Sequence, residues 1–249
     1  MDAFPAITAL SVLFGTALLA GTVRGFVGFG TGMIFLPLAA LEADPFEAIV
    51  ALIAMDLVGP LPALAGAAKH AHWRDLKRLI AGVALALPVG LWALSYLSPD
   101  MFRWLVSAVS LTMLIGLVAG WRFAGRLGSK TIFGTGLMSG FVGGVAGIPG
   151  PPVIFVYMAS PHPVATIRAN VTFFLLFYDW MMLAAFGLLS WLDWRMFLVG
   201  LLLIVPNMVG NFIGTKLFNP DHETVYRRVA YGIIGMSALA GLPILGLGT

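Results

Sequence analysis

The sequence predicts an all-α polytopic membrane protein built from two repeats of four segments, and two observations carry this prediction. First, 60% of its 249 residues are hydrophobic and only 10% are charged, with a mean hydropathy of +0.98. A soluble domain carries about 25% charged residues, so this chain cannot cover a surface that faces water. Second, one Gly-rich hydrophobic motif occurs twice and each time begins a series of apolar stretches.

Long stretches without charge supply the transmembrane segments, because a membrane-spanning helix needs about 20 predominantly apolar residues. Asp56 is the one charged residue in 48–68, and Asp179 is the one charged residue in 169–192. The stretches with no charge at all are 25–41, 79–99, 104–121, 131–167, 196–215 and 229–249. These eight stretches occupy nearly the whole chain, so we expect a single transmembrane domain over 1–249 in the plasma (inner) membrane.

The composition also excludes several functional classes. Residues 1–23 contain Asp2 but no Lys or Arg, so we interpret them as part of the first span and not as a secretory signal. There is no cysteine, which excludes disulfides, iron–sulfur ligation and thiol chemistry. The net charge of +3 comes mostly from short loops, where basic residues indicate membrane topology, and we expect no nucleic-acid partner.

The repeat is visible at the level of single residues. The segment GFVGFGTGMIFLPLA (25–39) recurs as GFVGGVAGIPGPPVI (140–154), with identities at a constant offset of 115. Further matches follow later in the chain at an offset of 121. Matches in order and at stable offsets indicate a duplication, with repeat 1 over 5–121 and repeat 2 over 131–247.

Each repeat is expected to begin with a broken or re-entrant Gly/Pro-rich segment and to continue with three plain spans. The Gly-rich segments are 5–41 and 131–159, and the plain spans are 46–68, 79–97, 103–121, 167–190, 196–217 and 228–247. As one helix, the 29 residues of 131–159 would extend about 43 Å, too short for two crossings of a core about 30 Å thick. We therefore expect two partial helices that meet at the motif.

Basic residues favour an inverted arrangement of the two repeats. The loops 69–78 and 122–130 are basic and fall on one side, which the positive-inside rule makes cytoplasmic. The acidic stretch 42–47 then lies outside. If 131–159 returns as a hairpin, the end 216–228 with its three basic residues is also cytoplasmic. A single crossing would leave one basic residue of this half on the cytoplasmic side, so the positive-inside rule favours the hairpin.

The paired glycine motifs are the strongest functional signal. Broken helices at matching places of two halves indicate a transporter's binding site, where helix N-termini and free N–H groups hold an anion. Gly28 and Gly143 are expected to need a backbone that a β-branched residue cannot adopt. The alternative is close helix packing, because Gly28/Gly32 and Gly143/Gly147 have the Gly-x-x-x-Gly spacing. Pro149 and the prolines after it lack the N–H that a helix needs, and they favour a break. We expect both breaks to form one anion site near the membrane midplane.

These motifs resemble those of the sulfite exporter TauE/SafE family. The resemblance covers nearly the whole chain and includes the Trp-containing loops 73–75 and 193–195. It implies a duplicated membrane transporter that moves sulfite, organosulfonates or related small anions. The family often has Thr-Ser near the start of the span after the motif, whereas the segments 168–172 and 48–51 of this chain read RANVT and AIVA. This departure leaves a substrate other than sulfite open.

Ionisable residues within spans are functional candidates, because burying a charge in the membrane is costly. Asp56, near mid-depth of its span, and Asp179, mid-span, are candidates for proton coupling, and a structural hydrogen bond is the alternative for each. Arg24 and Arg168 flank the motifs and can offset the substrate's charge through a bidentate fork. For both arginines the alternative is a side chain that snorkels to the interface.

Uncharged donors complete the candidate set. Asn207 and Asn211 suit helix–helix hydrogen bonds slightly better than anion coordination. The candidate substrate-binding residues are Arg24, Gly25, Gly28, Gly32, Gly143, Gly144, Gly147, Pro149, Arg168, Asn170 and Thr172.

The leading functional hypothesis is a proton-coupled secondary transporter of a small anion, with protons and the lipid bilayer as further partners and a homodimer left open. An uncoupled anion channel is the second hypothesis. An intramembrane enzyme is the third and less favoured, because the spans offer no Cys and no buried His. His70 and His72 lie in a basic loop, where we expect them to be solvated. We expect no metal and no other cofactor, and the sequence has no nucleotide or hydrolase motif.

Overall fold

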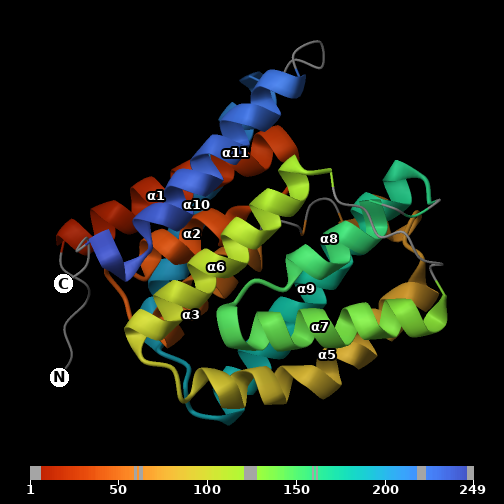
Figure 1. Ribbon diagram of the computed structural model, residues 1–249, viewed down its shortest axis with the longest axis horizontal. Helices are drawn as coiled ribbons and strands as arrows, with labels where there is room; N and C mark the ends of the chain where they lie inside the picture. Colours follow the sequence, from red (N-terminus) through yellow and green to blue (C-terminus); the bar gives the residue numbers. More distant parts are fainter. Residues whose placement is uncertain are drawn as a thin grey trace. The chain divides into compact units, whose positions relative to one another are not determined.

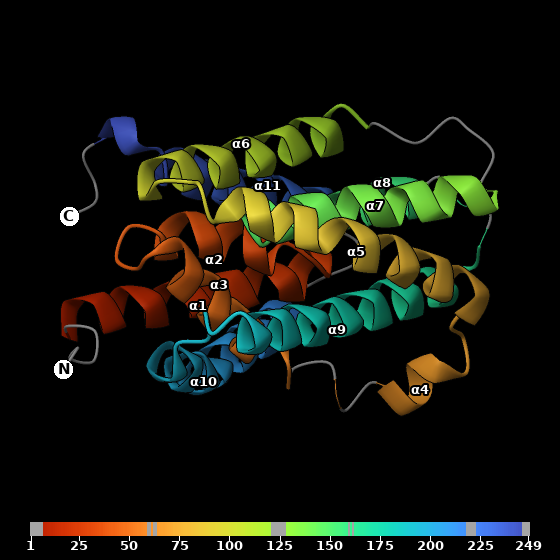
Figure 2. The ribbon, with the colours of Figure 1, turned by 90° about the horizontal axis from the view of Figure 1, so that it is seen from below.

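The computed structural model describes residues 7–58, 61, 64–120, 128–158, 160, 162–217 and 223–245. Regular structure is helical throughout these residues, as predicted, and no strand occurs among them (Figure 1, Figure 2). The helices are α1 (Ile7–Val27), α2 (Thr31–Ala39), α3 (Pro45–Asp56), α4 (Leu64–Ala68), α5 (Trp73–Leu94), α6 (Pro99–Val118), α7 (Ser129–Ala146), α8 (Gly150–Met158), α9 (Val164–Leu188), α10 (Trp194–Leu217), α11 (Glu223–Ala240) and the 3-10 turn η3 (Pro243–Leu245).

Five of the described helices, α1, α5, α6, α9 and α10, are long and apolar enough to cross a membrane. They confirm the prediction of an all-α, multi-pass membrane protein. Helix α5 begins six residues before the predicted span, because its first turns contain charged side chains such as Asp75 and Lys77 that a charge-free window excludes. The basic residues Arg122 and Arg126 of the predicted cytoplasmic loop, and part of the segment 216–228, lie outside the described residues.

One predicted span is wrong. The sequence predicts a plain helix over 46–68, whereas the structure has α3, which ends at Asp56, and the five-residue α4. The sequence between them contains Pro60 and Pro62, and proline has no N–H to continue the hydrogen-bond ladder of a helix. Asp56 therefore lies at the C-terminal end of a 12-residue helix and not at the middle of a span.

The chain divides into two compact units, each of which is described by itself. Unit 1 comprises residues 1–55, 98–118 and 191–249, and unit 2 comprises residues 56–97 and 119–190. Neither unit coincides with a sequence repeat. Unit 1 combines α1, α2, α3 and α6 of repeat 1 with α10 and α11 of repeat 2, and unit 2 combines α7, α8 and α9 of repeat 2 with α4 and α5 of repeat 1.

The main helix pair of unit 1 is α1 with α10, which pack along a seam of small residues. A Cβ on Gly25 would lie 2.5 Å from the Asn211 carbonyl oxygen and 2.8 Å from Gly214 Cα. Such backbone approach excludes any side chain larger than hydrogen. Asn207 Nδ2 also donates to the Ala17 carbonyl oxygen at 3.3 Å, which is the helix–helix hydrogen bond expected as the alternative for this residue.

Unit 2 contains the reciprocal pair, α7 with α5. A Cβ on Gly144 would lie 2.9 Å from Gly90 Cα, and a Cβ on Gly82 would lie 2.5 Å from the Phe133 carbonyl oxygen. In each unit, therefore, the first helix of one repeat packs against the second plain span of the other repeat. This exchange buries the glycine-lined faces of both Gly-rich segments.

Both Gly-rich segments are interrupted helices. Helix α1 stops before residues 28–30 and α2 follows, and α7 stops before residues 147–149 and α8 follows. In Figure 1 the chain turns back at each interruption, and the two helices of each segment remain in contact. The segment predicted as two partial helices consists of α7, with 18 residues, and α8, with nine.

Candidate functional site

The first helix break, at residues 28–30, depends on glycine. Gly28 and Gly30 have φ angles of 81° and 101°, in a left-handed region that other residues rarely adopt. The Gly28 N–H donates to the Arg24 carbonyl oxygen at 2.7 Å and closes the last turn of α1. Helix α2 then begins at Thr31. The chain thus leaves and re-enters helical conformation within three residues of an apolar segment.

Arg24 lies in the last turn of α1 and its side chain reaches across this break. Its Nη1 donates to Thr31 Oγ1 at 3.4 Å, and the residue is half-buried. Helix α2 has no side-chain cap at Gly30, so its first-turn N–H groups face the break without a capping oxygen. A guanidinium beside uncapped N–H groups suits an oxyanion, because both supply positive potential and hydrogen-bond donors.

Helix α11 borders the first break. The ring centroids of Phe26 and Tyr226 lie 5.3 Å apart, and the Ile234 side chain is the nearest group to Gly30, 3.6 Å from where a Cβ would stand. Ala230, between these two positions of α11, is completely buried. One face of α11 therefore covers the break.

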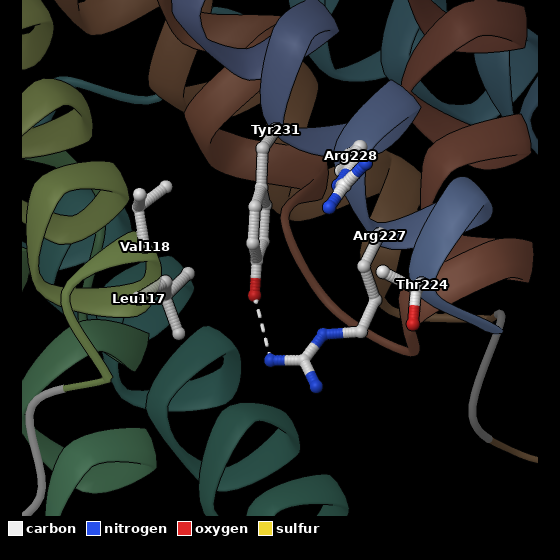
Figure 3. A pocket seen from close by; sticks show the side chains of 6 residues that line it. All are labelled: Leu117, Val118, Thr224, Arg227, Arg228 and Tyr231. Atoms are coloured by element: carbon white, nitrogen blue, oxygen red, sulfur yellow. Dashed lines mark hydrogen bonds between the residues drawn. The ribbon is translucent and has the colours of Figure 1, made fainter.

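The adjacent face of α11 lines a pocket of about 350 Å³ with the end of α6. The lining residues are Leu117, Val118, Thr224, Arg227, Arg228 and Tyr231 (Figure 3). The Arg227 side chain extends along the pocket, and its Nη2 donates to the Tyr231 hydroxyl at 3.1 Å (Figure 3). The described lining residues include two arginines and no acid, so they favour an anion. None of the predicted substrate-binding residues lines it.

The second break, at residues 147–149, is more enclosed. Gly147 has a φ angle of 71°, and its N–H donates to the Gly143 carbonyl oxygen at 2.7 Å to end α7. Ile148 and Pro149 are buried. At the offset of 115 from Arg24 the second repeat has Ser139, a buried residue whose hydroxyl has no hydrogen-bond partner among the described residues. A serine thus replaces the arginine of the first repeat.

Gly28 and Gly143 match in the sequence but differ in conformation. Gly28 lies in the first break, whereas Gly143 lies within α7, one turn before Gly147. A Cβ on Gly143 would lie 2.6 Å from the Tyr178 ring. The expectation of a left-handed backbone at Gly143 is therefore wrong, and in the second break Gly147 has that conformation.

Two predicted glycines belong to helix packing. Gly25 lies against α10 and Gly144 lies against α5, in the close helix packing that the sequence analysis gives as the alternative for the glycine motifs. Gly32 is different, because it follows Thr31 in the uncapped first turn of α2. It stays a predicted ligand-binding residue of the first break.

The predicted polar residues of unit 2 have different surroundings. Asn170 is completely buried, and its Nδ2 donates to the Tyr157 hydroxyl at 2.9 Å while its Oδ1 accepts from the His72 N–H at 2.7 Å. These bonds hold α8, α9 and the start of α5 together. Thr172 is half-buried, and Arg168 is exposed, which fits the interfacial alternative for that arginine.

The two candidate carboxylates differ in burial and in their position along the helix. Asp179 is 9% exposed in the middle of α9, as predicted. Asp56 is half-buried at the end of α3. The buried position makes Asp179 the stronger candidate for proton coupling.

Sequence reasoning missed a buried arginine in α6. Arg103 is 8% exposed, its Nε donates to the Gly241 carbonyl oxygen at 3.0 Å, and its Nη2 has no partner among the described residues. Ser107 and Ser110 lie on the same helical face, and their buried hydroxyls are likewise without a partner there. The spacing of four and then three residues places the arginine and the two serines on one helical face, and this pattern could have predicted the polar group.

Comparisons with known proteins agree on one family. Residues 13–241 match the sequence model of the family described as sulfite exporter TauE/SafE. A curated relative, the probable sulfite/organosulfonate exporter TauE of Cupriavidus necator, is 27% identical over 251 residues, which cover 95% of this chain and 94% of the relative. No solved structure matches the chain.

Proposed function

The chain belongs to the sulfite exporter TauE/SafE family, and we propose that it is a secondary transporter that exports a small sulfur oxyanion, with the first helix break as part of its substrate site. The family and the five apolar helices make it a multi-pass protein of the plasma membrane. A carrier of this kind needs a place among apolar helices where an anion is stabilised.

The position of Arg24 beside the uncapped α2 carries the proposal. Non-helical backbone within a membrane segment persists only where protein or water satisfies its polar groups. The cation beside residues 28–30 is the Arg24 guanidinium, whose Nη1 lies 3.4 Å from the Thr31 hydroxyl. The guanidinium can offer two parallel N–H groups to two oxygens of one ligand, and the first turn of α2 adds further N–H groups.

The substrate class follows from this donor set and from the relative. Sulfite and a sulfonate each present three oxygens on one sulfur, so two can meet a guanidinium while the third meets backbone N–H groups. The Cupriavidus necator relative is named for sulfite and organosulfonates. We therefore expect sulfite or an organosulfonate to bind more tightly than a monocarboxylate of similar size.

The proposal also includes the coupling of transport to protons. Asp179 is a buried carboxylate in the middle of α9, and an intramembrane carboxylate is a common element of proton relays. A coupled carrier gives saturable flux that depends on ΔpH, whereas a channel gives neither.

The test is counterflow in proteoliposomes that contain the purified protein. The vesicles are loaded with unlabelled substrate and diluted into a trace of labelled substrate, with sulfite, sulfoacetate, taurine and acetate compared. We expect transient accumulation of label for a sulfur oxyanion and none for acetate.

Two results would overturn the proposal. Flux that does not saturate and shows no counterflow indicates a channel. Counterflow that is equal for acetate and sulfoacetate indicates a carrier for another substrate class. The variant Arg24→Gln should keep the fold and lose most of the flux.

A further inference from the structure

Three side chains of unit 2 converge on one point outside the helix breaks. His72 directly precedes α5, Asp75 lies in the first turn of α5, and His162 lies between α8 and α9. His72 Nδ1 lies 3.0 Å from Asp75 Oδ2, and His162 Nε2 lies 3.4 Å from the same oxygen. All three potential ligand atoms lie within 4.8 Å of one another.

The two separations from Asp75 Oδ2, 3.0 and 3.4 Å, are close to those between ligand atoms of a small transition-metal site. Donor atoms at about 2.0–2.1 Å from one tetrahedral zinc ion lie about 3.4 Å apart. Two imidazoles and one carboxylate are a common ligand set for zinc and for iron(II), and three protein ligands leave a position for water or an anion. The chain has no cysteine, so no thiolate competes with these ligands.

The surroundings orient the cluster and leave it accessible. The side chain of Asp75 is 5% exposed, whereas those of His162 and His72 are 26% and 44% exposed. Arg78 Nη1 lies 3.4 Å from Asp75 Oδ1, the oxygen that faces neither histidine. An outer partner of this kind holds a metal ligand in place. The backbone N–H of His72 donates to Oδ1 of the buried Asn170 and fixes the main chain at His72, and the exposed imidazole edges allow an ion to enter from water.

We propose that His72, Asp75 and His162 bind one divalent transition-metal ion of the zinc type through Nδ1, Oδ2 and Nε2. The ion links the start of α5 to the chain that precedes α9, two helices that also pack together. The site is independent of the proposed transport function. Of the two loop histidines that the sequence analysis expects to be solvated, His70 is exposed and takes no part in the cluster, whereas His72 belongs to it.

Zinc binding to the full-length protein tests the proposal. The protein is purified without a histidine tag, treated with a chelator and titrated with Zn²⁺ by calorimetry. We expect one ion per chain for the wild type. His162→Ala and His72→Ala should each weaken binding more than the roughly 10–100-fold that loss of an outer-shell partner costs. X-ray absorption of the zinc-loaded protein should show nitrogen and oxygen ligands.

The matched control is His70→Ala, which changes a histidine of the same loop and should bind zinc as the wild type does. His162→Gln keeps a hydrogen-bonding side chain and should fold even if His162→Ala does not. Wild-type protein that binds no zinc, or His162→Gln protein that binds it as tightly as the wild type, would show a hydrogen-bonded cluster only and overturn the proposal.

Discussion

Arg24 Nη1 and the Thr31 hydroxyl lie 3.4 Å apart, although a non-helical interruption separates the helices that carry them. The contact places a cation beside the first break. Helix α2 has no side-chain cap at its first turn. A positive side chain and a positive helix end therefore face the same short segment. We expect both groups to attract an anion that enters this segment.

The first prediction concerns Arg24. Arg24→Gln should weaken sulfonate binding about 10- to 100-fold, because a hydrogen bond to a charged group contributes about 1.5–3 kcal/mol. Arg24→Lys should give an intermediate loss, since it keeps the charge but not the planar fork. Calorimetry on purified protein measures both. Arg168→Gln is the control and should change affinity by about twofold or less. If Arg24→Gln binds the sulfonate with wild-type affinity, Arg24 is not part of the substrate site.

The second prediction separates the two kinds of glycine in α1 and its break. Gly28→Ala meets open space but a φ of +81°, which costs an L residue about 1–2 kcal/mol. Because Gly28 lies in the break, this substitution should lower both substrate affinity and unfolding temperature. Gly25→Ala should lower the free energy of unfolding by about 1–3 kcal/mol through overpacking against α10, with affinity kept in the folded fraction.

The control for both glycines is Gly187→Ala, an exposed position of α9 with open space around it. Its unfolding temperature should stay at or above that of the wild type. Equal effects of Gly25→Ala and Gly28→Ala on affinity would contradict the distinction between packing and break.

The third prediction concerns Gly143 and Tyr178. Gly143→Ala should destabilise the protein, because the added methyl group would lie 2.6 Å from the Tyr178 ring. Tyr178→Leu should relieve much of this cost, with a coupling energy in the range of about 0.5–3 kcal/mol for residues in contact. Unfolding of the single and double variants in detergent gives the cycle. Strictly additive effects would mean that Tyr178 is not what restricts Gly143.

The fourth prediction concerns proton coupling. Asp179→Asn should fold and bind substrate but lose the dependence of transport on ΔpH, because the amide cannot release a proton. Asp56→Asn should have a smaller effect, since Asp56 is half-buried at a helix end. Asp100→Asn, with a side chain 74% exposed, is the control. If transport by Asp179→Asn depends on ΔpH as in the wild type, the carboxylate has a structural role and does not couple protons to transport.

The fifth prediction is the membrane topology inferred from basic residues. Cysteine at Lys69 and at Thr224, both exposed, should react with an impermeant thiol reagent only after the cells are opened. Cysteine at the exposed Glu42 should react on intact cells. The chain has no native cysteine, so the background is low. Labelling at position 224 from outside would contradict the inverted repeat.

Sequence patterns alone predicted the membrane class and the positions of the two Gly-rich interruptions to within one turn, and the duplication stays a prediction. Both follow from short-range physics: apolar length sets the spans, and glycine and proline favour an interruption where they follow one another closely with few other residues that stabilise a helix. The first break lies at the predicted motif. The second lies one turn beyond Gly143 because the left-handed conformation falls on Gly147, and identical residues do not reveal which glycine of a motif leaves the helix.

The contacts between distant residues could be found only in the folded protein. The pairing of α1 with α10 and of α7 with α5 places Gly25 and Gly144 in helix packing, although the sequence motif alone allows a ligand role. The meeting of Asp75 with His162 joins residues that are distant in the chain. Such contacts depend on complementary helix faces and on close backbone approach, which are properties of the packed helices and not of any one segment.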